Sequence, residues 1–113
     1  MEKLFLQMKE FLSMDSEISF KEFEAYYKEL MAFLKEELEK LSQEEVLQAV
    51  LILGTTSPNA AERATRKGLE AKKYKKMAQK AEFWLDALNF RLKGQGMTQE
   101  DIEKACEAIN EAI

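Results

Sequence analysis

The chain has 113 residues and a net charge of -4, and it contains no histidine and one cysteine, Cys106. It therefore lacks the residues for Ser–His or Cys–His catalytic pairs, two-histidine metal sites, the Glu-x-x-His pattern of di-iron bundles and an internal disulfide. A hydrophobic content of 46% excludes a wholly disordered chain, and four glycines with one proline are too few for the frequent turns of a β-sandwich or barrel.

Apolar residues recur every three or four positions along most of the chain, which predicts an all-α protein. We expect a single domain over residues 1–113, folded as an up-down helical bundle of about five helices, two long and three short. The predicted helices cover residues 2–13, 19–41, 43–53, 58–93 and 98–112.

Three of these helices begin at a capping box or a close variant of it. In this motif a hydroxyl accepts from a free backbone N–H, and an acid three residues later reaches back to the cap. The pairs are Ser19 with Glu22, Ser42 with Glu45, and Thr98 with Asp101. A fourth start is predicted at Ser57-Pro58, with serine as the N-cap and proline at the first helical position. The preceding Gly54 then marks the end of the third helix.

The predicted helix 58–93 changes character along its length. Its second half presents a bulky apolar face, with Phe83 on the flank as a candidate interface residue. Its first half carries a seam of small residues that would let another backbone approach closely, namely Ala61, Ala64, Gly68 and Ala71. A straight helix of this length would measure about 54 Å, whereas a compact domain of this size has a radius of gyration of about 13 Å. We therefore expect a homodimer built on this helix, or alternatively a monomer bent near Gly68.

Charge is unevenly distributed. Residues 1–46 hold twelve acids and six bases, residues 57–94 four acids and ten bases, and residues 95–113 five acids and one base. The stretch 63–80 is the most basic, with a single acid against eight bases. These candidate anion-binding or partner-binding residues are Arg63, Arg66, Lys67, Lys72, Lys73, Lys75, Lys76 and Lys80.

Two interpretations of this basic stretch remain open. Closely spaced cations suit a polyanion, because each phosphate contact releases counterions. However, the five lysines from Lys72 to Lys80 fall on one arc of the helix, opposite Tyr74 and Met77, as on any amphipathic bundle helix with a solvated face. Arg63, Arg66 and Lys67 differ, because they point in the direction that becomes the apolar face further along.

The sequence favours a non-enzymatic protein–protein interaction module, an adaptor or regulator that forms a homodimer and contacts an unknown protein. The alternative is a nucleic-acid-binding protein that uses the basic stretch. We expect no cofactor, no metal and no membrane contact. The N-terminal segment lacks the uninterrupted apolar run and cleavage site of a signal peptide, which predicts a cytoplasmic protein.

Overall fold

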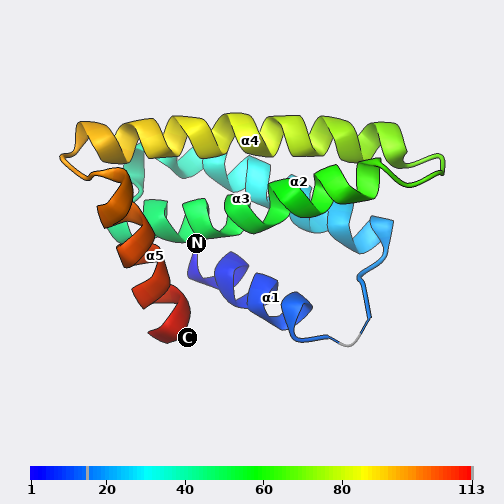
Figure 1. The fold of residues 1–113 in the computed structure, drawn as a ribbon, viewed down its shortest axis with the longest axis horizontal. Coiled ribbons are helices and arrows are strands. Elements are labelled where there is room, and N and C mark those ends of the chain that lie inside the picture. Colours follow the sequence, from blue (N-terminus) through cyan, green and yellow to red (C-terminus); the bar gives the residue numbers. More distant parts are fainter. Residues whose placement is uncertain (15, 113) are drawn as a thin grey trace.

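A computed structural model describes residues 1–14 and 16–112, and these residues form five α-helices and a short 3-10 turn (Figure 1). The all-α helical bundle expected from the sequence is confirmed. The elements are α1 (Glu2–Leu12), α2 (Phe20–Glu37), the 3-10 turn η1 (Leu38–Lys40), α3 (Gln43–Ala64), α4 (Ala71–Gly94) and α5 (Gln99–Ala112).

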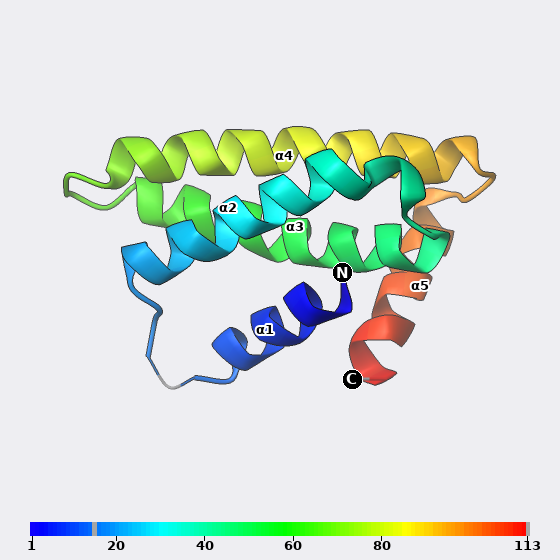
Figure 2. The same ribbon diagram turned by 180° about the vertical axis from the view of Figure 1, so that it is seen from behind.

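Helices α3 and α4 form a long antiparallel hairpin that organises the rest of the molecule. Helix α1 packs along α3, and α5 crosses the hairpin at the end where α3 begins and α4 ends (Figure 1). Helix α2 runs diagonally across the face of the hairpin that is turned towards the viewer in Figure 2. The main core lies around α3, where Val46, Ile52 and Leu53 are fully buried together with Leu30 and Leu34 of α2. None of the helices in the described part of the chain has the length and apolar character needed to cross a membrane.

All three capping boxes form as predicted. The side chains of Ser19 and Ser42 accept from the third backbone N–H of α2 and α3, and the acids at those positions accept from the cap N–H groups. The same reciprocal bonds join Thr98 and Asp101 before α5. Local hydrogen bonding therefore fixes where these helices begin.

The predicted boundary between the third and fourth helices is wrong. Helix α3 continues through Gly54 and Pro58 to Ala64, and the Ser57 side chain donates to the Ala78 carbonyl instead of capping a helix. Pro58 removes the N–H that would bond the Gly54 carbonyl, but both residues face water, which can solvate that carbonyl. Burial of the next turns of α3, down to Ala60, outweighs the cost of the proline.

The predicted single helix over 58–93 is also wrong, because the chain reverses between Ala64 and Ala71. Gly68 lies in this turn with a φ of 154°, which residues with a side chain rarely adopt. The seam of small residues is consequently divided among the end of α3, the turn and the start of α4. The molecule measures 43 × 26 × 25 Å with a radius of gyration of 14.1 Å, so the length argument for a dimer no longer applies.

The new helix boundary predicts opposite effects for two glycine substitutions. Gly54→Ala should raise the free energy of unfolding by about 0.5–1 kcal/mol, because the position is helical and open. Gly68→Ala should lower it by about 1 kcal/mol or more, because its φ is unfavourable for alanine. Urea denaturation measures both. A destabilising Gly54→Ala would indicate that the helix ends at Gly54 after all.

Candidate functional site

The basic stretch 63–80 is divided by the fold into three different environments. Lys72, Lys73, Lys75, Lys76 and Lys80 are all exposed on α4. Both interpretations of these lysines, as a solvated face and as a polyanion-binding surface, require this exposure. Lys73 also places its Nζ 5.4 Å from the centre of the Phe20 ring, a cation–π contact at the start of α2.

Arg63 is buried, with only 8% of its surface exposed, and lies inside an aromatic cluster. Its Nη1 donates to the Ile18 carbonyl and to the Tyr74 hydroxyl, both at 3.1 Å. Its guanidinium carbon lies 4.8 Å from the centre of the Phe23 ring and 5.6 Å from that of Tyr74. Arg63 therefore joins the N-terminal end of α2 to the α3–α4 hairpin.

Arg66 is engaged by two acids at the surface. It donates to both carboxylate oxygens of Glu17 at 2.7 and 2.6 Å, and to those of Glu62 at 3.3 and 2.6 Å. The hydrogen bonds from Arg66 lower the pKa of Glu17 below its ordinary value. Lys67 is exposed in the turn that follows. Of the three cations that the sequence places apart from the α4 lysines, Arg63 and Arg66 thus make hydrogen bonds within the chain.

The lowered pKa of Glu17 predicts a pH dependence of stability. The contribution of this carboxylate is present above the unfolded pKa, near 4.5, and is lost as the pH falls through the lower folded value. Glu17→Gln should therefore be less stable than the unaltered chain at about pH 6, and the difference should shrink towards pH 3. Urea denaturation across this range measures it. A stability difference between the two chains that does not change with pH would contradict the lowered pKa of Glu17.

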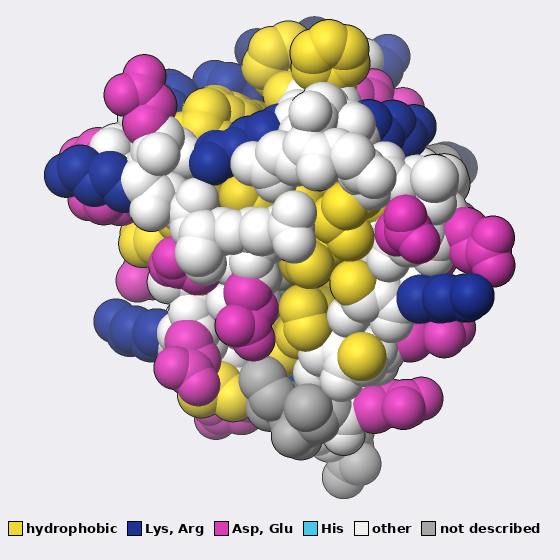
Figure 3. Space-filling view, turned by 90° about the vertical axis from the view of Figure 1, so that its left-hand side faces the viewer, with side chains coloured by type: hydrophobic (Ala, Val, Ile, Leu, Met, Phe, Trp, Pro, Cys, Tyr) yellow, Lys and Arg dark blue, Asp and Glu magenta, His cyan; other side chains and the backbone are white. Residues whose placement is uncertain are grey.

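Large apolar side chains are exposed on the outer side of α4. Phe83 and Phe90 are 67% and 80% exposed, whereas Trp84 is half-buried against the main core. Figure 3 shows hydrophobic side chains projecting at the top of the view, over α4. At 100° per residue, Phe83 and Phe90 lie almost directly opposite the buried Tyr74, Ala81 and Leu92.

These residues belong to a continuous line along α4. Lys76 precedes Phe83 by seven positions, Phe90 follows it by seven, and Ala87 lies between the two phenylalanines. We call Lys76, Phe83, Ala87 and Phe90 the outer stripe. Gln79 and Asp86 flank it on one side and Lys80 on the other, and all seven residues are exposed.

Acidic residues and the cysteine do not gather into a metal-binding cluster in the described part of the chain. Cys106 is buried, its thiol lies 3.8 Å from the Leu47 carbonyl, and burial raises its pKa. This environment is that of a packing residue.

Comparisons with protein-family models, with curated proteins and with solved structures find no match to this chain.

Proposed function

We propose that this protein is a non-enzymatic helical interaction module that pairs with a second copy of itself through the outer stripe of α4. The observation that supports this proposal is the exposure of two phenylalanines opposite the core. A side chain of this size contributes about 1.5–3 kcal/mol when it is fully buried. Phe83 and Phe90, which lie on one line of α4, therefore form an exposed apolar surface that a second helix can cover.

An antiparallel pair of α4 helices with a twofold axis at Phe83 is self-complementary. In this register Phe83 meets the partner subunit's Phe83, and Phe90 lies over the partner subunit's Lys76, which suits a cation–π contact. Asp86 reaches the partner subunit's Gln79 on the same flank. On the other flank, the aliphatic stem of Lys80 covers the partner subunit's Ala87.

The competing register places Phe83 against the partner subunit's Phe90. The twofold axis then falls next to Asp86, so that two carboxylates of like charge face each other across the interface. Such pairs are destabilising. Charge therefore favours the register centred on Phe83, and the symmetry closes the assembly at two chains.

The pairing should be weak and concentration-dependent. Specific stable interfaces bury about 1,200–2,000 Å² in total, and one helical stripe on each chain supplies less than that. We expect a dissociation constant on the order of 10–100 µM. Weak pairing suits a regulator or adaptor whose outer stripe is exchanged between its own copy and another protein.

The nucleic-acid alternative stays a prediction. The basic surface that a nucleic acid could contact consists of the exposed lysines of α4 and Lys67, because Arg63 and Arg66 bond within the chain. Binding to a random DNA duplex that falls steeply with salt and disappears when Lys72, Lys73, Lys75 and Lys76 are changed to Glu would favour this alternative. The absence of binding at low salt would end it.

Phe83→Glu should abolish self-association without unfolding the chain, because it places two buried carboxylates on the twofold axis. Leu6→Glu is the matched control, since Leu6 is an exposed apolar residue of α1 that lies away from the outer stripe. Sedimentation velocity at several hundred micromolar should show only monomer for the first variant and unaltered association for the second. Equal association in both variants would contradict the proposed interface.

A further inference from the structure

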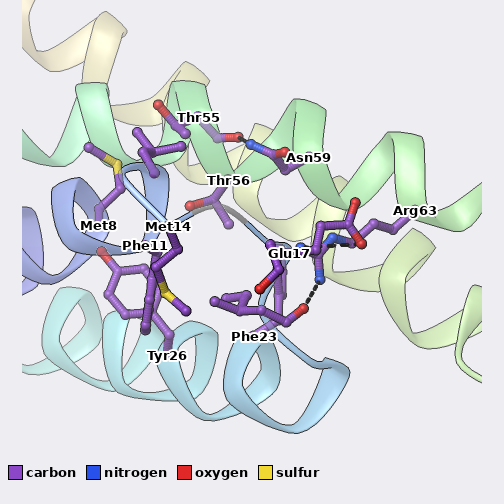
Figure 4. A pocket seen from close by; sticks show the side chains of 13 residues that line it. Met8, Phe11, Met14, Glu17, Phe23, Tyr26, Thr55, Thr56, Asn59 and Arg63 are labelled. Atoms are coloured by element: carbon purple, nitrogen blue, oxygen red, sulfur yellow. Dashed lines mark hydrogen bonds and ion pairs between the residues drawn. The ribbon is translucent and has the colours of Figure 1, made fainter.

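A pocket lies at the meeting point of three helices, α1, α2 and α3, and of the segment that precedes α2. The self-association proposed above gives this pocket no role. Its volume is about 260 Å³. Met8, Phe11 and Tyr26 lie at one end and Glu17 and Arg63 at the other, with Thr56 between them (Figure 4). The pocket is therefore lined by large apolar side chains at one end and by the charged side chains of Glu17 and Arg63 at the other.

Arg63 has hydrogen-bonding capacity left at this end of the pocket. Among the described residues, both of its hydrogen bonds use Nη1, and its Nη2 is 4.0 Å from the nearest carboxylate oxygen, on Glu17. That carboxylate is already held by two short bonds from Arg66. Within the described part of the chain, the one carboxylate near the buried Arg63 side chain is thus held by a stronger competitor, and Nη2 of Arg63 has donors to offer to an anion.

The dimensions of the pocket set the size of a ligand. Thr56 and Arg63 both line it, and they lie seven residues apart on one face of α3, or about 10 Å along the helix axis. A cavity of about 150 Å³ holds one benzene molecule. On that scale 260 Å³ holds about ten non-hydrogen atoms.

We propose that this pocket binds a medium-chain carboxylic acid of about eight carbons. The carboxylate accepts from Nη2 of Arg63, and the alkyl chain runs along α3 past Thr56 to Met8 and Phe11. The flexible Met8 and the exposed Met14 allow the walls to adapt to the chain. This site is independent of the outer stripe, which lies on the far side of α4.

The charges around the pocket restrict the head group to a single negative charge. Glu17 also lines the pocket, with a carboxylate oxygen 4.0 Å from Nη2 of Arg63, so that a doubly charged phosphate would be repelled more strongly by this acid than a singly charged ligand. An uncharged alcohol with the same chain would fill the apolar part but lose the charge-assisted bond to Arg63. The proposal therefore ranks ligands of equal chain length by head group, with the carboxylate first.

The test is titration of the full chain with octanoate and, separately, with 1-octanol, below the concentrations at which either aggregates. Calorimetry should give a dissociation constant on the order of 10–100 µM for octanoate and one at least about tenfold weaker for the alcohol. Amide shifts in 15N-labelled protein should centre on the pocket residues of α1 and α3. Equal affinities, no binding, or shifts centred on α4 near Phe83 would each overturn the proposal.

Two variants separate the pocket from the fold. Arg63→Gln should weaken octanoate binding at least about tenfold and octanol binding by a much smaller factor, because the alcohol makes no charge-assisted bond to this residue. Because that change alters a buried residue, Leu12→Glu provides a second test at the exposed rim of the pocket, with Leu6→Glu as its match on the same helix. Leu12→Glu should weaken octanoate binding several-fold, and Leu6→Glu should not. Equal effects of the two glutamates would contradict the location of the site.

Discussion

Arg63→Met is expected to lower the free energy of unfolding by about 2–4 kcal/mol, the largest effect we predict for a single side chain outside the apolar core. Methionine fills much of the same volume but leaves the Ile18 carbonyl and the buried Tyr74 hydroxyl without their donor. It also removes the cation from the faces of Phe23 and Tyr74, contacts worth about 0.5–2 kcal/mol. Part of this loss is offset because a buried charge is no longer desolvated.

Arg66→Met is the matched control for Arg63→Met. Arg66 makes more and shorter ion pairs, but it is 47% exposed, and surface pairs contribute about 0–1 kcal/mol. Urea denaturation of both variants compares the two arginines directly. If Arg66→Met proves the more destabilising, the ion pairs at the surface, and not the buried aromatic contacts, hold the end of α2 to the hairpin.

Cysteine cross-linking should identify the register of the proposed dimer. In a Cys106→Ala background, Phe83→Cys should form a disulfide-linked dimer with itself at several hundred micromolar, because residue 83 lies on the twofold axis. Phe90→Cys alone should not cross-link, since the two positions lie about 21 Å apart along the paired helices. A mixture of Phe90→Cys and Lys76→Cys should form the mixed dimer.

The competing register predicts a different pattern. A mixture of Phe83→Cys and Phe90→Cys would then form the mixed dimer efficiently, and Phe83→Cys alone would not. Non-reducing electrophoresis after brief oxidation distinguishes the two patterns. No cross-link at any of the three positions would contradict an α4 interface in either register.

The sequence predicts those parts of the fold that depend on neighbouring residues. The capping boxes at Ser19, Ser42 and Thr98 are satisfied within three residues, so their positions could be recognised without knowledge of the tertiary structure. The exposed lysines of α4 and the buried Tyr74 and Met77 follow from helical periodicity in the same way. Periodicity also separates the exposed Phe83 from the half-buried Trp84.

The errors arise where distant contacts decide the structure. Gly54 and Pro58 are ordinary helix-ending signals, but the burial of the following turns against α2 and α4 carries α3 past them. The role of Arg63 depends on Ile18 and Tyr74, 45 and 11 residues away, and no local pattern joins these positions. The pocket was missed for the same reason, because its walls come from four separate segments.

The most direct test of the proposed self-association is the mass of the unaltered chain as a function of concentration. Sedimentation equilibrium should give a mass near 13.1 kDa at low micromolar concentration. The mass should rise towards twice that value at several hundred micromolar, with a dissociation constant on the order of 10–100 µM. A mass that stays at 13.1 kDa over the whole range would contradict pairing through the outer stripe.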